Sequence, residues 1–472
     1  MATCRRILIL TWGILFFAGC SAPEPAPLTA SAVEGSLAAP AMSVLRMKAQ
    51  QIRHPLLKGL VLDDRDGISP DEAAVLAVLV NPSLRAIRDQ RGVAQAQLLQ
   101  AKLLPNPTAE LTNDFPYAGP DPFVAYGVLL KWDISQLITQ GAKEDAVRSQ
   151  AATVDLDVAW QEWQVAQTAR SAVYKQLLLE QQLSLARDVD RGLKENLQTV
   201  QKAVRQQLKT ETDLSAADAA SVEAHTTVLQ LEREFAKGRL ALNRLLGLPP
   251  HQDVRLQSVP LPSQMTPPTL EALEQGLDQG RLDLLALRRG YDAQEANIRA
   301  AVLGRFGQFS LGPSHGRDTS SNYTFGYNAS VDLPIFDQGQ GKIAIEQATR
   351  QRLFDEFVNR VHEARSDIAT ALADIDSLNR QIRFATDALP ALQRLVQSYE
   401  RALAAGNADV LSYYTARNNL AKKRIDLLKL KQELIDTWIS LENASGQYLL
   451  QPNQPTSAPA LISGPISRSS KE

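Results

Sequence analysis

A long run of heptads constrains this chain more than any other feature. From Phe354 to Leu403 the gaps between apolar residues alternate three and four without a break for seven heptads. The seam consists of Phe354, Phe357, Val361, Ala364, Ile368, Ala371, Ile375, Leu378, Ile382, Ala385, Leu389, Leu392, Val396, Tyr399 and Leu403. Such a repeat keeps its stripe in register only when helices supercoil against neighbours. It predicts a helical rod of roughly 75 Å, which Pro390 should bend or divide into two segments.

Length and charge narrow the class of protein. The chain has 472 residues, and its long seam indicates one elongated architecture rather than several independent domains. Its 50 basic and 52 acidic residues are interspersed and give a net charge of −2. This balance offers no large basic face to nucleic acid, so we expect no nucleic-acid partner.

The N-terminus has the pattern of a lipoprotein signal over residues 1–19. Arg5 and Arg6 precede a short apolar run, and Phe17-Ala18-Gly19-Cys20 is similar to the bacterial lipobox, in which Cys20 becomes the lipid-modified first residue. An ordinary secretory signal with a chance cysteine is the alternative. Ser21 resembles the sorting pattern for the outer membrane. Residues 20–68 are expected to form a tether and extended segment, with flexible chain through residue 50.

The rest of the chain divides into helices and strands. Ser69, Pro70 and Glu72 predict a capped helix that runs to about Leu104 with a break near Asn81-Pro82. Strands are expected at Thr108–Asn113 and Phe123–Ile134. Residues 142–246 contain no proline and read as helix, with a reversal near Gln207–Asp213.

The same pattern then starts again, which indicates an internal duplication. Leu84-Arg85-Ala86-Ile87-Arg88 is echoed 200 residues later by Leu284-Leu285-Ala286-Leu287-Arg288, and past the strands the offset is 199, as in Lys143 with Lys342 and Gly247 with Gly446. In the first copy, polar residues interrupt the seam 14 residues apart, at Glu162, Gln176 and Asp190. The predicted parts are a first repeat at 69–250, a linker at 251–268, a second repeat at 269–450 and a disordered tail at 451–472.

The strand at Asn322–Leu333 alternates cleanly. Tyr323, Phe325, Tyr327, Ala329, Val331 and Leu333 face one way, and small or polar residues face the other. This alternation is typical of a membrane-barrel strand, and half of a soluble sandwich is the alternative. Only four such strands are expected, two per repeat, whereas a closed barrel needs about eight. Because open edges are not tolerated in lipid, several chains would share one barrel.

Nearly all of the mature chain resembles the TolC family of outer-membrane efflux and secretion channels. The resemblance rests on the duplication, on Leu103-Leu104-Pro105-Asn106-Pro107 before the first strand, and on Leu333-Pro334-Ile335-Phe336-Asp337-Gln338-Gly339-Gln340-Gly341 after the fourth. Leu389-Pro390 and Ala405-Gly406 also fit. Within the family, the chain looks most like the outer-membrane subunits of cobalt–zinc–cadmium-type export systems.

The resemblance implies a mainly α fold with a β-barrel part. Three chains would form a 12-stranded membrane barrel continued by a 12-helix tunnel across the periplasm. The implied partners are two further copies, a periplasmic adaptor, an inner-membrane pump of the RND or another type, and outer-membrane lipid. The implied function is a passive exit duct, for heavy-metal cations, for drugs or for type I protein secretion. A lipid-anchored periplasmic coiled-coil scaffold or adaptor is the competing class.

Candidate site residues lie at the helix reversals, near Gln207–Asp213 and Gly406–Ser412. In the family these tips form the periplasmic entrance and meet the adaptor. The residues aligned there include Thr210, Asp213, Gly406, Asp409 and Ser412. Some family members carry a ring of aspartates at the positions of Ser412 and Thr415, which this sequence lacks. Asp213 and Asp409 are candidate substitutes, because three-fold repetition would gather like charges that favour cations; ordinary solvated helix ends are the alternative.

Other chemistry is poorly supported by the sequence. The five histidines have no ligand spacing, and we expect no metal site, cofactor or catalytic residue. Trp132 and Tyr323 are candidates for an aromatic girdle at the membrane surface, with ordinary strand packing as the alternative.

Overall fold

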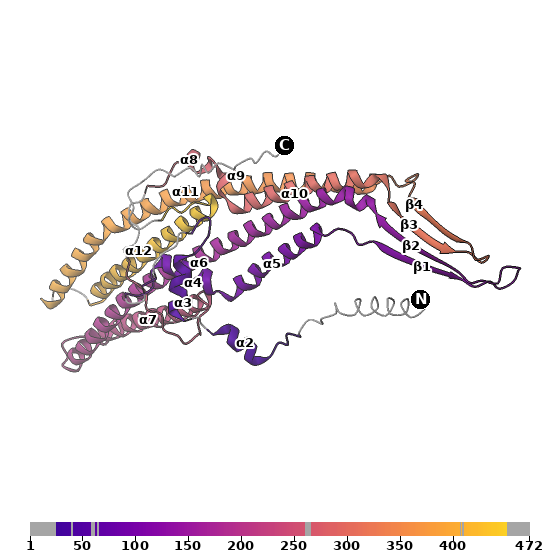
Figure 1. Ribbon diagram of the computed structural model, residues 1–472. Coiled ribbons are helices and arrows are strands. Elements are labelled where there is room, and N and C mark those ends of the chain that lie inside the picture. Colours follow the sequence, from indigo (N-terminus) through magenta and orange to yellow (C-terminus); the bar gives the residue numbers. More distant parts are fainter. Residues whose placement is uncertain are drawn as a thin grey trace. The chain divides into compact units, whose positions relative to one another are not determined.

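The computed structural model describes residues 25–38, 41–57, 62–63, 66–259, 266–405, 407 and 410–450. The chain divides into two compact units, 1–40 and 41–472, whose elements are labelled in Figure 1. In the first unit, α2 (Ala30–Leu37) begins after Thr29, whose hydroxyl accepts a hydrogen bond from the amide of Ala32 at 3.2 Å. The predicted signal peptide and the predicted C-terminal tail lie outside the described residues.

The second unit begins with a helix where a tether was expected. α3 (Met42–Gln50) packs on α4 (Pro70–Val80) and buries Leu45 and Ala49 in a shared apolar cluster. The prediction of flexible chain through residue 50 is therefore wrong for this helix. Leu45 and Ala49 are an i, i+4 pair on one helix face, and they are easily overlooked in a segment rich in Ala and Ser.

The predicted start and break of the first long helix are confirmed. The amide of Ser69 donates to Glu72 Oε2 at 2.9 Å, and the amide of Glu72 donates to Ser69 Oγ at 3.2 Å, which completes a capping box. α5 (Pro82–Lys102) follows Asn81, whose side-chain oxygen accepts from the amide of Ser83 at 2.9 Å. Asn81 thus ends one helix and caps the next.

Four strands form one antiparallel sheet in the order β1-β2-β3-β4. They are β1 (Thr108–Asp114), β2 (Ala125–Asp133), β3 (Phe309–Arg317) and β4 (Tyr323–Val331). Each repeat supplies one hairpin, and β2 and β3 join the two hairpins. The predicted mainly helical fold with two strands per repeat is confirmed. β2 is shorter than predicted and ends at Asp133, because the side chain of Asp133 caps the next helix by accepting from the amide of Ser135 at 3.0 Å.

Two pairs of long helices continue from the sheet. α6 (Ile134–Arg205) has 72 residues and reverses into α7 (Glu211–Leu245). The second repeat comprises α8 (Leu270–Glu274), α9 (Leu277–Gly280), α10 (Leu282–Leu303), the short 3₁₀ helix η1 (Gly304–Phe306), the hairpin, α11 (Gln340–Ala404) and α12 (Val410–Ser445). The reversals fall where the sequence predicted them.

The helix that carries the heptad seam is continuous through its proline. α11 has 65 residues with Pro390 inside, so the predicted division into two segments is wrong, although Figure 1 shows that the helix curves. Pro390 removes the hydrogen bond that the carbonyl of Thr386 would accept. Both residues are exposed, so water can donate a hydrogen bond to that carbonyl. The turns on either side of Pro390 keep their own hydrogen bonds, and these hold the helix together.

The middle of the seam forms the largest apolar cluster of the described residues. Ala364, Ile368, Ala371, Ile375 and Leu378 are buried against α10 and α12, and two residues of α6 belong to the same cluster. Val396, Tyr399 and Leu403 join a second cluster near the reversals. The seam therefore packs helix on helix along most of its length.

Each repeat also closes on itself at equivalent positions. Asn81 Nδ2, before α5, donates to the carbonyl of Leu245 at the end of α7 at 3.0 Å. Arg281, before α10, donates to the carbonyl of Ala444 at the end of α12, also at 3.0 Å. The glycine that follows each last helix, Gly247 or Gly446, has a positive φ of 58° or 67°. These paired contacts support the duplication inferred from the sequence offsets.

Candidate functional site

The sheet has two chemically distinct faces. The cross-strand pairs Leu111↔Val128, Trp132↔Leu311, Phe309↔Val331 and Pro313↔Tyr327 place their side chains on one face, because paired residues share a face. The alternate residues, including Thr112, Gly127, Ser314 and Gly326, form the other face. On the apolar face Leu111 is 71% exposed, Phe325 70% and Tyr327 79%. A sheet that exposes large apolar side chains in this way is suited to contact with lipid.

The two aromatic girdle candidates lie on this apolar face at opposite ends of the sheet. Trp132 is next to the helix end of β2, and its indole nitrogen donates to the carbonyl of Pro105 at 2.8 Å. Tyr323 opens β4 at the far end, where it pairs with Arg317. Their amphipathic rings are thus separated by the length of the strands, and their place in a girdle stays a prediction.

The first helix tip is built around Thr210 and Asp213. Thr210 Oγ1 accepts from the amide of Asp213 at 3.1 Å, while Asp213 Oδ2 accepts from the amide and from the hydroxyl of Thr210, each at 2.9 Å. This capping box stabilises the start of α7. One role of Asp213 is therefore to cap α7. This role fits the alternative interpretation, in which the candidate residues are ordinary solvated helix ends.

The second tip repeats the backbone of the first. The amide of Leu208 donates to the carbonyl of Ala203, and the amide of Asn407 donates to the carbonyl of Ala402, both at 2.8 Å and 199 residues apart. Gln207, at the position equivalent to Gly406, has a φ of 60°. Gly406 and Asp409 lie outside the described residues, and Ser412 is half-buried in the first turns of α12.

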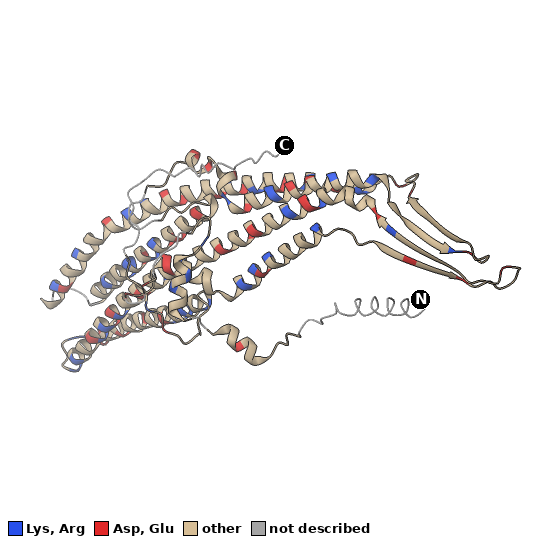
Figure 2. Cartoon of the chain, in the orientation of Figure 1, with Lys and Arg blue, Asp and Glu red and all other residues tan. Residues whose placement is uncertain are grey.

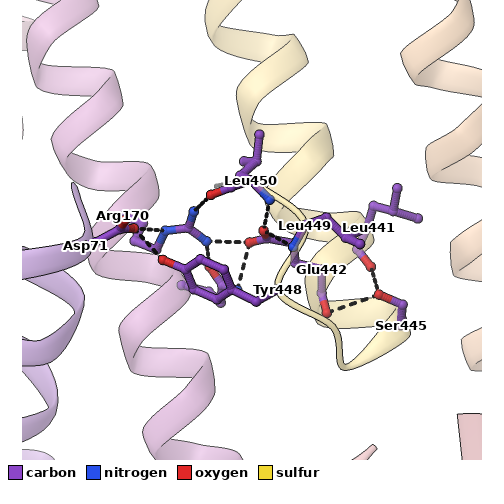
Figure 3. Close-up of polar contacts among 9 residues, drawn as sticks. Asp71, Arg170, Leu441, Glu442, Ser445, Tyr448, Leu449 and Leu450 are labelled. Atoms are coloured by element: carbon purple, nitrogen blue, oxygen red, sulfur yellow. Dashed lines mark hydrogen bonds and ion pairs between the residues drawn. The ribbon is translucent and has the colours of Figure 1, made fainter. Parts of the chain in front are cut away.

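A buried polar cluster joins the two repeats, and the sequence did not reveal it (Figure 3). Arg170 on α6 forms an ion pair with Glu442 on α12, and neither side chain is exposed. Gln167 Nε2 donates to Glu442 Oε2 at 2.8 Å. The other carboxylate oxygen of Glu442 accepts from the amides of Leu449, at 2.7 Å, and Leu450.

The chain after α12 completes this cluster. The guanidinium of Arg170 lies 4.3 Å from the ring centroid of Tyr448, donates to the carbonyl of Leu450 at 2.8 Å and lies 3.1 Å from Asp71 Oδ1. The hydroxyl of Tyr448 donates to Asp71 on α4. The cluster thus ties α4, α12 and the residues that follow α12 to α6.

Burial controls the ionisation of these groups. It raises the pKa of Glu442, although Arg170 opposes the rise. It also raises the pKa of Tyr448, and Asp71 adds to that rise. Tyr448 therefore stays protonated and donates, and Arg170 stays charged because Glu442 and Asp71 outweigh its desolvation. Two features of the sequence could have indicated the cluster: Gln167 and Arg170 share a helical stripe with Tyr174 and Leu178, and Glu442 is 199 residues after Asn243, a polar residue at the equivalent position of the first repeat.

The three polar interruptions of the first seam each bind another element. Glu162 Oε1 accepts from Arg88 Nε on α5 at 2.6 Å. Gln176 Nε2 donates to the carbonyl of Phe235 on α7 at 3.2 Å. Asp190 forms an ion pair with Lys194 at 2.8 Å, and its other carboxylate oxygen lies 3.5 Å from Nδ1 of His225 on α7. Each polar residue therefore aligns α6 with a neighbouring helix.

His54 holds the segment before α4 against α6. His54 Nδ1 accepts from the amides of Leu56 and Leu57, so Nε2 carries the proton and donates to the carbonyl of Ala159 at 2.8 Å. Burial lowers the pKa of His54, and Ala159 and Glu162 oppose the change.

Other classes of site find no support in the described part of the chain. Among its residues, no three His, Cys, Asp or Glu side chains gather as a metal-ion site. Of its helices, none has the length and apolar character needed to cross a membrane. Cys20, the predicted lipid attachment, is outside the described residues.

Comparisons with known proteins agree with this architecture. Residues 273–447 match the family model described as outer membrane efflux protein. The cation efflux system protein CusC of Escherichia coli K12 is 28% identical over 292 residues, which cover 58% of this chain and 62% of CusC. The match thus spans less than two thirds of that relative.

The pyoverdine export outer membrane protein OpmQ of Pseudomonas aeruginosa is 22% identical over 224 residues, covering 46% of this chain and 47% of OpmQ. A crystal structure of CusC superposes with a TM-score of 0.66 at 21% identity, covering 84% of this chain and 98% of that one. The fold is therefore shared over a longer stretch than the sequence similarity. Residues 273–447, in the second repeat, match the outer membrane efflux protein family, and the chain has the fold of CusC and of other solved outer-membrane channels.

Proposed function

We propose that this protein is a passive outer-membrane channel of an efflux system. The observation that carries the proposal is the two-faced sheet at the end of the long helices. Its apolar face exposes large side chains that water would not favour, and its other face carries the small and polar residues of a hydrated lumen. The proposed channel performs no chemical step, so it needs no catalytic group or cofactor.

The sheet supports a barrel shared by several copies. β1 and β4 are its edge strands, and in lipid their unpaired backbone groups need partners. Pairing β4 of one copy with β1 of the next is a head-to-tail contact, which closes into a ring. Three copies would supply the 12 strands of a closed barrel.

The helices support the same arrangement. α6 is flanked by α5 and α10 near the sheet and by α7 and α12 farther away, while α11 lies beyond α10 and α12. The outer edges are therefore α5 and α7 on one side and α11 on the other. Both edges expose apolar residues, among them Val93, Val222, Leu229, Phe354 and Phe384. Contact between these edges would bury them and close a tunnel wall.

The proposed partners are a periplasmic adaptor at the helix tips and an inner-membrane pump that supplies the energy. The proposed cargo is a heavy-metal cation, because the relative CusC is named for cation efflux. A metal-chelating small molecule is the second candidate, because the relative OpmQ is named for pyoverdine export. Lipid attachment at Cys20 and a cation-attracting ring from Asp213 and Asp409 belong to the same proposal.

Purified full-length protein in planar bilayers tests the channel. We expect a heat-modifiable trimer in outer-membrane fractions and stepwise ionic conductance. A monomer that leaves the membrane when its lipid anchor is cleaved would contradict the channel and favour the scaffold. Deletion of the gene in its host tests the cargo. Growth of the deletion strain is then compared with the parent on heavy metals, on drugs and on iron-limited media in which a metal chelator has to be exported. Unchanged metal tolerance alongside drug sensitivity would reject metal export.

A further inference from the structure

Exposed apolar side chains gather where the sheet meets the helices. Six of them define what we name the collar: Leu103, Leu104, Phe306, Leu333, Ile335 and Phe336. Phe336 is 91% exposed and Phe306 is 72% exposed. None of the six belongs to a strand, so the collar is distinct from the apolar face of the sheet.

Contacts between its segments place the collar along one level of the molecule. Gln140 Nε2 on α6 donates to the carbonyl of Lys102 at 3.1 Å, which fixes the end of α5 beside α6. A Cβ at Gly304 would lie 3.9 Å from Thr139 Cγ2, and one at Gly339 would lie 3.7 Å from Arg305 Cα. The end of α5, the start of α6, η1 and the turn before α11 are therefore neighbours, and the collar crosses the whole width of the chain.

Four basic residues lie on the helix side of the collar. They are Lys102, Lys143, Arg305 and Lys342, and we name them the basic arc; Figure 2 shows blue at the ends of the helices nearest the sheet. All four are exposed, and within the described part of the chain none forms an ion pair. Lys143 and Lys342 hold equivalent positions in the two repeats, 199 residues apart.

The nearby carboxylates are largely engaged elsewhere. Asp133 caps α6, and Asp337 Oδ1 accepts from the amide of Gly339 at 2.9 Å. Glu144 pairs with Arg148 at 2.5 Å, and Asp145 lies 3.7 Å from Arg148 and from Arg299. Asp332 has no side-chain hydrogen bond or ion pair among the described residues. Together with Arg148 and Arg299, the four cations of the arc outnumber these five carboxylates by one, so the region keeps a small net positive charge.

We propose that the collar and the basic arc seat the protein in the membrane leaflet on the helix side of the barrel. The collar lies in the acyl-chain boundary, and the arc binds the phosphates of anionic phospholipids. Apolar side chains bordered by lysines and arginines match such an interface, because the long cationic side chains reach the headgroups. This inference rests on the proposed membrane channel and adds a lipid-binding surface that fixes its depth.

Site-specific photocrosslinking in cells tests the collar. Benzoylphenylalanine in place of Phe336 or Leu104 is expected to give phospholipid adducts by mass spectrometry. The matched control is Leu208, which is 72% exposed at the helix reversal and should give none. A crosslink from Phe336 to a second copy of the chain, or no adduct at all, would overturn the proposal.

Lipid selection tests the basic arc. Full-length protein is reconstituted in vesicles of equal phosphatidylglycerol and phosphatidylcholine, purified, and its retained lipid is measured. Replacing all four residues of the arc by Gln should lower the phosphatidylglycerol enrichment about twofold or more. The control replaces three lysines and one arginine far from the sheet, Lys202, Arg205, Lys422 and Lys429, and should keep the enrichment. Equal loss in both variants would refute the arc.

Bilayer conductance of the same preparations separates the two proposals. Conducting trimers whose collar gives no lipid adducts would reject the collar and leave the channel standing. Lipid adducts without conductance would support the collar and count against the channel.

Discussion

Arg170 and Glu442 form a fully buried ion pair across the two repeats, although 272 residues separate them in the sequence. The pair is stable only because further groups share its charges. Arg170 also contacts Asp71 and the carbonyl of Leu450, and Glu442 also accepts from Gln167 and two backbone amides. A buried charge without such partners would be costly.

The first prediction concerns this pair. Arg170→Met leaves the Glu442 carboxyl buried without its cation and should cost about 3–5 kcal/mol of unfolding free energy. The double variant Arg170→Met, Glu442→Leu should lose much less than the sum of the two single variants. Denaturant unfolding in detergent measures both effects.

The matched control for that prediction is an exposed ion pair between α6 and α7. Arg187 lies 2.7 Å from Glu232, but their side chains are 55% and 41% exposed. Arg187→Met should cost about 0–1 kcal/mol. Equal losses at Arg170 and Arg187 would mean that burial does not set the strength of the first pair.

The second prediction concerns His54. Burial lowers its pKa below 6.5. Between that lowered pKa and 6.5, the unfolded segment binds more protons than the folded one, so folding stability rises with pH and is complete above 6.5. Hydrogen exchange at the amides of Leu56 and Leu57, which donate to His54, should therefore quicken as the pH falls through this window, after correction for intrinsic exchange.

His54→Asn is the control, because its side-chain oxygen can still accept from those amides but does not titrate. The variant should show a flatter pH profile. A profile that matches the wild type would assign the pH dependence to another group.

The third prediction concerns the glycines that end the two repeats. A Cβ at Gly247 would lie 2.7 Å from the carbonyl oxygen of Val80, and one at Gly446 would lie 2.9 Å from Arg281 Cγ. Both residues have positive φ, so Ala at either position should cost about 1–3 kcal/mol. Gly141→Ala in α6 meets nothing within 4 Å and should stabilise the helix by about 0.5–1 kcal/mol. Thermal melting of the three variants compares them.

The fourth prediction separates two roles of Asp213. Thr210→Ala and Asp213→Ala both break the capping box and should each cost about 1 kcal/mol of α7 stability. Only the second removes a carboxylate from the proposed entrance. Reversal potentials in planar bilayers should show reduced cation preference for Asp213→Ala and not for Thr210→Ala. Identical behaviour of the two variants would leave Asp213 as a cap alone.

Local and periodic signals were sufficient to predict most of the fold. The capping residues Ser69 and Glu72, the break at Asn81 and the reversals depend on neighbouring residues, and the structure confirms them. The heptad seam predicted the helix packing because supercoiling is encoded in its period. The alternation in β4 predicted the two faces of the sheet.

The errors came from tertiary context. α3 is held by Leu45 and Ala49, which have a partner only once α4 is in place. α11 continues past Pro390 because water can hydrogen-bond to the carbonyl of the exposed Thr386, and a proline in the sequence does not show whether the flanking turns hold the helix together. The Arg170 cluster joins α4, α6 and α12, and contacts between elements so far apart in sequence leave no periodic trace. Its only hints were a polar residue on an apolar stripe and the equivalence of Glu442 with Asn243.

The two longest helices end at equivalent positions, Arg205 and Ala404, but α6 has 72 residues and α11 has 65. The whole difference of one heptad lies at the sheet end, where the first turns of α6 correspond to the turn at 333–339. The offset of 199 residues is the same on both sides of this turn, as in Asp133 with Asp332 and Lys143 with Lys342, so no residue is inserted or deleted there. Two helical turns in one repeat therefore take the place of an exposed loop in the other, while the two rods keep the same register along the rest of their length.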